Sequence, residues 1–290
     1  MICDAHVHFF SPGFFAALKA DRAAVAALGF DVPESAESLA DRWVAELDAN
    51  GVAQAAVMAS LPGDADSVAT ALARHPSRFV GFFMVDPTRD DAMAYATRAL
   101  DAGLRTICLF PAMHRYPLYD ERVARVFGLA ASRPGTALFV HCGVLSVGIR
   151  GKLGLPSPFE IRFGNPLDLH GVALKFGAVP IVIPHFGAGM LREALMVASL
   201  CPNVLLDTSS SNSWIRQTPG LTLEQVFRTA LDVVGAERLL FGTDSSFFPR
   251  GWNPDVYVQQ KTALDSLGID ATDQEKIFSG NFKRLFREAP

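Results

Sequence analysis

Five titratable side chains of this sequence stand at or near the end of a short apolar run. His6 and His8 lie two residues apart in the first run, and residues i and i+2 of a strand point to the same side. The other three come singly at the ends of later runs: His141, His185 and Asp244. Imidazole nitrogens with one carboxylate suit zinc and neighbouring divalent metals. These residues predict a metal centre if the fold brings the run ends together.

Each of these residues also has an ordinary structural explanation. A single histidine at a strand end is commonly a satisfied core residue, and Asp244 could cap the helix that follows it. However, five titratable residues at corresponding ends of the runs are hard to explain one by one, and together they favour the metal centre. Outside this set, His75 before Pro76 and His170 in a helical stretch are interpreted as structural, while His114 is a candidate to support a metal ligand.

Eight apolar runs divide the sequence, with helical patterns between them. Continuous hydrophobicity is typical of parallel strands buried on both faces, and several intervening stretches stop at Gly or Pro as helices do. Strand followed by helix, eight times over, predicts an α/β fold of the (β/α)8 TIM-barrel type, with residues 1–290 as a single domain. The runs lie at 2–8, 53–59, 79–85, 104–110, 136–142, 179–185, 203–209 and 238–244.

An open, doubly wound sheet is the alternative architecture. It would carry a glycine-rich phosphate loop after the first strand, where this chain reads HFFSPGFF.

In a barrel the carboxyl ends of all strands meet at one mouth, which holds the active site. Long connections at 9–37, 143–168 and 208–222 leave those same ends. They predict substrate walls or lids, although surface decoration would give the same pattern.

Composition limits the class of protein. Half of the 290 residues are hydrophobic, the net charge is −4, and no Lys/Arg cluster suggests a nucleic-acid surface. No apolar run has the length of a membrane span, and an N-terminal signal is not expected. The four cysteines show no paired spacing, which predicts reduced, buried thiols. We therefore expect a cytoplasmic protein with no nucleic-acid or membrane partner.

The motif set resembles the amidohydrolase superfamily. The HxH pair of the first strand, single histidines on the fifth and sixth, and the aspartate of the eighth carry the resemblance. Finer features resemble the amidohydrolase-related branch, which contains the aminocarboxymuconate semialdehyde decarboxylase-like enzymes: DAHVHF, HFGAG, FGTD and the terminal SGNFKRLF, similar to the branch's GNAxRLF ending. The resemblance spans residues 1–287. By position it implies His6, His8, His141 and Asp244 as metal ligands, and His185 as the catalytic or transition-state-stabilising imidazole.

The resemblance also implies the metal and the reaction. In many binuclear members a carbamylated lysine on the fourth strand bridges two metals, but that strand reads TICLFP here, so we expect one Zn²⁺, with Mn²⁺ as the alternative. Such a metal activates water, Asp244 would accept the proton, and His185 would support the developing oxyanion. This chemistry predicts a metal-dependent hydrolase acting on an ester, lactone, amide or activated C–C bond in a small organic acid.

Three other functions stay open. The first is non-oxidative decarboxylation of an aromatic or unsaturated carboxylic acid, which would make the enzyme a carbon–carbon lyase. The second is an inactive barrel that acts as a binding protein, although its ligand set would be expected to be broken. The third is a phosphate-binding isomerase, which needs a glycine-rich site after the last two strands, where TSSSNS and TDSSFF are rich in serine.

Candidate substrate-binding residues lie on the connections after the strands. Arg115, Arg150 and Arg250 could each bind a carboxylate in bidentate fashion, or be ordinary surface arginines. Trp214 belongs to a group of aromatic side chains that could line an apolar pocket or cover the mouth against a neighbouring subunit. We expect a small-molecule substrate, a carboxylic acid or its ester or lactone, and a homo-oligomer. The other aromatic residues of the group are Phe9, Phe10, Phe14, Phe15, Phe247, Phe248 and Trp252.

Overall fold

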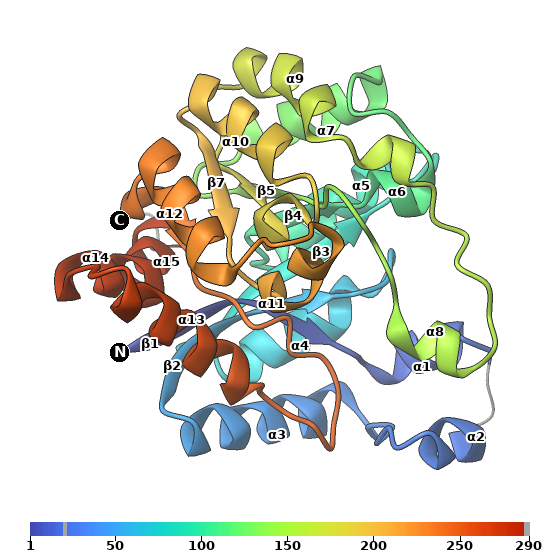
Figure 1. Cartoon of the computed structure of the whole chain (residues 1–290). Coiled ribbons are helices and arrows are strands. Elements are labelled where there is room, and N and C mark those ends of the chain that lie inside the picture. Colours follow the sequence, from blue (N-terminus) through green and yellow to red (C-terminus); the bar gives the residue numbers. More distant parts are fainter. Residues whose placement is uncertain (20–21, 287–290) are drawn as a thin grey trace.

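Eight parallel strands form a nearly closed barrel in the computed structural model, which describes residues 1–19 and 22–286 (Figure 1). Each strand is hydrogen-bonded to the next one in the sequence, from β1 to β8. Backbone bonds from Ala5 N–H to the Phe241 oxygen (2.8 Å) and from His8 N–H to the Ser245 oxygen (2.7 Å) join β1 to the chain beyond Leu240. The predicted TIM barrel is thereby confirmed. The strands are β1 Ile2–Phe9, β2 Val52–Ala59, β3 Phe79–Val85, β4 Thr106–Leu109, β5 Ala137–Val140, β6 Ile181–Ile183, β7 Val204–Asp207 and β8 Leu239–Leu240.

Helices surround the barrel and fill the connections between its strands (Figure 1). Some begin at the signals expected from their sequence, such as the capping boxes of Ser35 with Ser38 and Thr222 with Gln225. The α-helices are α1 Pro12–Ala17, α2 Arg22–Ala27, α3 Ala36–Ala49, α4 Ala65–Arg74, α5 Ala92–Asp101, α6 Pro111–His114, α7 Glu121–Ala131, α8 Gly148–Lys152, α9 His170–Lys175, α10 Leu191–Leu200, α11 Ser211–Trp214, α12 Leu223–Val234, α13 Pro254–Ser266, α14 Ala271–Glu275 and α15 Asn281–Leu285. The 3-10 helices are η1 Ile161–Gly164, η2 Pro166–Leu169, η3 Pro184–Gly187, η4 Ile215–Gln217 and η5 Ala236–Arg238, and η6 Lys276–Gly280 is a π-helix.

Most strand positions are apolar because both faces of the strands are buried. In β3, Phe82 and Met84 belong to the cluster inside the barrel, whereas Phe83 and Val85 belong to the cluster between the strands and the helices. Residues two apart share a face of a strand, so an alternating pattern appears only where one of the faces meets water. This explains why the strands read as unbroken apolar runs.

The later strands are shorter than the apolar runs that predicted them. β5 ends at Val140, β6 at Ile183 and β8 at Leu240, so His141, His185 and Asp244 lie just beyond the strands. His185 (φ 57°) and Asp244 (φ 59°) adopt left-handed backbone conformations, which are uncommon for residues other than glycine. Such conformations cluster at functional sites, where the surrounding fold enforces them.

Two further expectations concern membranes and thiols. Across residues 1–19 and 22–286, no helix combines the length and the apolar character needed to cross a membrane. Cys3, Cys108, Cys142 and Cys201 are all free and buried, as the absence of paired spacing predicted.

Candidate active site

His6 is fixed at the barrel mouth by a buried carboxylate 201 residues further along the sequence. Its Nδ1 lies 2.7 Å from Oδ2 of Asp207, the last residue of β7, and donates a hydrogen bond to it. Its Nε2 is buried, has no hydrogen-bond partner, and lies 3.7 Å from Oδ1 of Asp244. An unpaired buried nitrogen facing a carboxylate is costly unless a positive charge lies between them.

His8 presents its Nε2 to the same carboxylate. The Ser60 hydroxyl donates its one proton to the Met58 carbonyl (3.1 Å), so it accepts a hydrogen bond from His8 Nδ1–H (2.6 Å). This bond leaves a lone pair on His8 Nε2, which lies 3.2 Å from Asp244 Oδ1. Two acceptors at this separation again require a proton or a metal cation between them.

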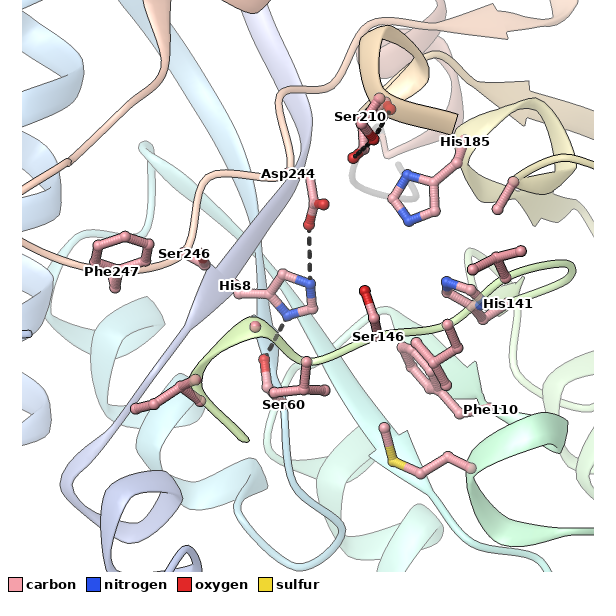
Figure 2. Close-up of a pocket in the computed structure, with 18 of the residues that line it drawn as sticks. His8, Ser60, Phe110, His141, Ser146, His185, Ser210, Asp244, Ser246 and Phe247 are labelled. Atoms are coloured by element: carbon pink, nitrogen blue, oxygen red, sulfur yellow. Dashed lines mark hydrogen bonds and ion pairs between the residues drawn. The ribbon is translucent and has the colours of Figure 1, made fainter. Parts of the chain in front are cut away.

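His185 and His141 complete the ring of imidazoles. His185 Nδ1–H donates to the Ser209 carbonyl (2.9 Å), which can only accept, so its Nε2 is also left with a lone pair. The His185 ring stacks on that of His6 with centroids 4.9 Å apart, and the His141 ring lies 5.2 Å from it. Figure 2 shows His8, His141, His185 and Asp244 arranged around one common space.

The pKa shifts of these groups favour neutral imidazoles around an ionised carboxylate. Burial lowers the pKa of His8 and His185, and burial together with the neighbouring His185 and His6 lowers that of His141 well below its usual value. Burial raises the pKa of Asp244, but its close contact with His8 and the attraction of the nearby imidazoles outweigh burial, so the net shift is downward.

His6 is the exception among the imidazoles. Burial lowers its pKa, but the carboxylates of Asp207, Asp244 and Asp4 together raise it by more, so the net shift is upward. Because Nδ1–H is already engaged with Asp207, the added charge would sit on Nε2. The site therefore favours positive charge at its centre. Neutral imidazoles with a carboxylate are the form in which these side chains bind divalent metals, and the residues fit such an ion.

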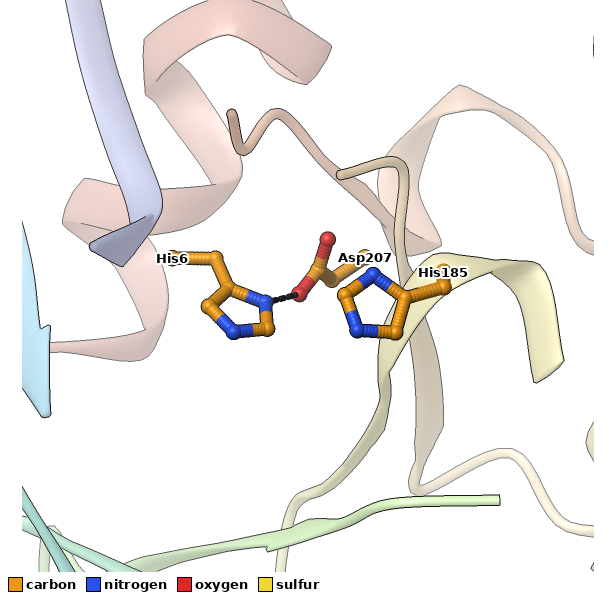
Figure 3. A group of neighbouring side chains, drawn as sticks. All are labelled: His6, His185 and Asp207. Atoms are coloured by element: carbon orange, nitrogen blue, oxygen red, sulfur yellow. Dashed lines mark hydrogen bonds and ion pairs between the residues drawn. The ribbon is translucent and has the colours of Figure 1, made fainter. Parts of the chain in front are cut away.

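Two overlapping groups of described residues bring potential ligand atoms within 4.8 Å of one another. One contains His6, His8 and Asp244, and the other contains His6, His185 and Asp207 (Figure 3). In the second group Asp207 already accepts hydrogen bonds from His6 Nδ1–H and from the Ser209 backbone N–H (2.5 Å). In the first group the Nε2 atoms of His6 and His8 are not engaged by another side chain that donates to them. The first group is therefore better suited to bind a cation. His141 belongs to neither group, although its ring adjoins that of His185.

Comparison with protein families gives the identity of the chain at the family level. The family model described as Amidohydrolase matches residues 3–287.

The chain belongs to the amidohydrolase family.

This result confirms the resemblance expected from the motifs. Among curated proteins, fluG of Emericella nidulans is 27% identical over 165 residues, a match that covers 55% of this chain and 17% of that protein. The chain thus spans only a small part of this relative's length.

Solved structures similar to this amidohydrolase are TIM-barrel proteins and other amidohydrolases. An uncharacterised TIM-barrel protein from Bordetella bronchiseptica has a TM-score of 0.69 at 22% identity, covering 98% of this chain and 97% of the other. An amidohydrolase from Burkholderia multivorans with bound zinc has a TM-score of 0.67 at 17% identity and covers 100% of both chains. A probable 2-pyrone-4,6-dicarboxylic acid hydrolase from Acinetobacter baumannii with bound citric acid has a TM-score of 0.64 at 15% identity, covering 98% of both chains. At these identities the likeness shows the fold alone.

A cavity of about 470 Å³ opens above the imidazoles of this amidohydrolase. Trp214 and Arg250, both predicted to bind substrate, line it, and the buried Trp214 Nε1–H has no hydrogen-bond partner. Arg115 and Arg150 do not line it, because their guanidinium groups donate to the Pro158 and Pro156 carbonyls of the long connection after β5. The structure therefore separates the predicted arginines into one at the cavity and two away from it.

The remaining histidines lie apart from the cavity lining. His75 pairs with Asp41 through Nε2 (2.7 Å), and His170 opens α9, in keeping with structural roles. His114 stacks on Tyr116, with centroids 6.4 Å apart, and does not line the cavity. Its support of a metal ligand stays a prediction.

Asp207 is the site residue that sequence reasoning missed. It lies near the end of the seventh run, in LLDTS, so the rule that singled out the other strand-end residues applies to it equally. It is fully buried, and its pKa is lowered because the charge and hydrogen bond of His6 outweigh burial, which alone would raise it. Such a carboxylate fixes the tautomer and orientation of a metal-binding imidazole.

Asp207→Asn is expected to weaken metal binding by about 10–100-fold, the usual effect of losing a contact that orients a ligand. Asparagine keeps the size of the side chain but offers one acceptor oxygen in place of two charged ones. Competition titration against a chelator measures the change, with Asp232→Asn on the outer helix α12 as a matched control. Equal affinities for wild type and Asp207→Asn would remove this role from Asp207.

Proposed function

We propose that this amidohydrolase is a mononuclear metal-dependent hydrolase, with one divalent ion, zinc as first choice, held by His6, His8, His141 and Asp244. The main support is the buried His6 Nε2, which has no partner and faces the Asp244 carboxylate. The engaged Nδ1 atom of His8 adds support, since it too leaves a lone pair on Nε2. Bound zinc in the Burkholderia relative is consistent with the choice of metal.

A divalent ion in this position supplies Lewis acidity, which acidifies water and polarises a substrate carbonyl. The carboxylate of Asp244 is ionised and about 30% exposed, so it can accept a proton from water in the cavity. Its Oδ1 lies near the Nε2 atoms of both His6 and His8, the two imidazoles proposed to share the ion with it.

His185 is suited to move that proton onward. Its Nδ1–H is held by the Ser209 carbonyl, and its pKa is lowered by burial, so the ring is neutral with an acceptor Nε2. A neutral imidazole with this tautomer takes up a proton at Nε2 and can then release it to a leaving group or hydrogen-bond a developing oxyanion. We therefore assign His185 to proton transfer rather than to metal binding.

The test compares metal-loaded protein with protein stripped by a chelator. Both are assayed for hydrolysis of esters, lactones and amides of small carboxylic acids, and for release of CO2 from aromatic and unsaturated acids. Metal-dependent hydrolysis is expected. Full hydrolytic activity in the stripped protein would contradict the metal mechanism, and metal-dependent release of CO2 without hydrolysis would replace hydrolysis with decarboxylation.

A further inference from the structure

Two cationic side chains lie near one aromatic ring on the wall of the cavity. Arg250, between β8 and α13, places its Cζ atom 4.6 Å from the centroid of the Phe247 ring. Lys152, at the end of α8, places its Nζ atom 6.0 Å from the same centroid and 4.7 Å from that of Phe30. All four side chains line the cavity. Three connections, those that leave β1, β5 and β8, meet at this point.

Neither cation has a carboxylate within 4.0 Å among the described residues. Many surface arginines of this chain are paired, as Arg42 is with Asp31 (2.7 Å). Arg250 instead donates to two neutral oxygens, the backbone oxygen of Asp244 (3.3 Å) and the hydroxyl of Ser246 (3.0 Å). Arg250 is exposed, so its guanidinium is open to an anion in the cavity.

The charge of the cavity lining is unbalanced. Asp244 is the single acidic side chain among the lining residues, and the proposed metal would neutralise it. Lys152, Arg216 and Arg250 line the same cavity and carry positive charge. A cavity of this sign attracts anions and raises their local concentration.

We propose that Arg250 and Lys152 form a carboxylate-binding subsite beside the Phe247 ring, so that the substrate carries a carboxylate separated from its reacting bond by an apolar or aromatic segment. This inference rests on the proposed function for the position of the reacting bond, at Asp244 and the imidazoles. The planar fork of a guanidinium matches a carboxylate, and the ammonium adds a second charge. The Phe247 ring supplies a flat apolar surface for the segment between the two ends of the substrate.

The local structure holds both cations in place. The guanidinium of Arg250 donates a hydrogen bond to the backbone oxygen of Asp244. This bond keeps the guanidinium close to the proposed reaction centre. α8 is fixed by Ile149, which belongs to a separate apolar cluster with Phe14 and Phe30 at the cavity mouth. The ammonium of Lys152 stays over the Phe30 ring because a cation is attracted to the face of an aromatic ring.

The test is calorimetric titration of the metal-loaded protein with trans-cinnamate and with its neutral isostere trans-cinnamamide. Cinnamate should bind at least about tenfold more tightly than the amide, the scale expected for a hydrogen bond to a charged group. Lys152→Gln and Arg250→Gln should each weaken cinnamate about tenfold and reduce its advantage over the amide. Arg250→Lys should retain part of the affinity, and a thermal melt of each variant checks its fold.

Lys175→Gln is the matched control. Lys175 also lies over an aromatic ring, with its Nζ atom 5.5 Å from the Phe176 centroid, but it is outside the cavity lining. It should leave cinnamate affinity unchanged. The subsite is overturned if cinnamate fails to bind or binds no more tightly than the amide. It is also overturned if neither Lys152→Gln nor Arg250→Gln changes the affinity for cinnamate, the result expected for a carboxylate held by the metal alone.

A parallel assay separates this proposal from the proposed function. Wild-type protein is tested for metal content and for hydrolysis of the neutral ester 4-nitrophenyl acetate. Carboxylate binding that depends on Lys152 and Arg250, without metal-dependent hydrolysis, would keep the subsite and reject the hydrolase. Metal-dependent hydrolysis without a preference for carboxylate would keep the hydrolase and reject the subsite.

Discussion

His185→Asn is expected to keep its metal and its fold while losing about 10²-fold or more in turnover, the scale of a lost acid–base group. The imidazole lines the cavity, and the Ser209 carbonyl holds its Nδ1–H so that Nε2 is the working atom. Asparagine is smaller and cannot carry a proton between Asp244 and a leaving group. Turnover of any substrate found in the hydrolase screen, together with metal content and thermal melting, measures the effect.

Two variants bracket this result. His141→Asn should lose metal as well as turnover, because His141 is a proposed ligand, whereas His75→Asn, on the outside of the barrel beside Asp41, should behave like wild type. Near-wild-type turnover of His185→Asn would reject its role in proton transfer. Loss of metal from His185→Asn would instead move the ion to the group formed by His6, His185 and Asp207.

His6→Ala and Asp244→Ala are each expected to lose nearly all bound metal. His6 Nε2 and Asp244 Oδ1 lie 3.7 Å apart across the proposed centre, so either substitution removes one of the proposed metal ligands. Losing a contact that only orients a ligand costs about 10–100-fold in metal affinity, and loss of the ligand itself should cost more. Elemental analysis of protein purified without added metal gives the metal-to-protein ratio directly.

His170→Ala, at the start of α9, is the control for this measurement and should retain the wild-type ratio. Circular dichroism shows whether the barrel survives in each variant. Wild-type metal content in both His6→Ala and Asp244→Ala would reject the proposed ligand set, because the ion would then have to lie elsewhere in the molecule.

The barrel, and the gathering of the candidate residues at its mouth, were predictable because the signals for them are local. Unbroken apolar runs such as FVGFFMV, which became β3, follow from burial of both faces of a strand, and the alternation of side chains makes His6 and His8 share a face. In a barrel, all strand ends meet at one mouth, so residues at these ends are expected to gather there. The same reasoning would have included Asp207, the last residue of β7.

The direction of long side chains and the path of long connections were decided only by the tertiary structure. Arg150 and Arg250 both follow strands, yet one bonds to the Pro156 carbonyl and the other borders the cavity. The position of Lys152 at the cavity could not be predicted from the sequence, because its partners Phe30 and Phe247 lie about a hundred residues away on either side. The roles of the imidazole nitrogens likewise depend on Ser60, Asp207 and Ser209, each from a different strand end than the histidine it holds. Local periodicity specifies which face a residue occupies, whereas such contacts arise only when distant segments pack together.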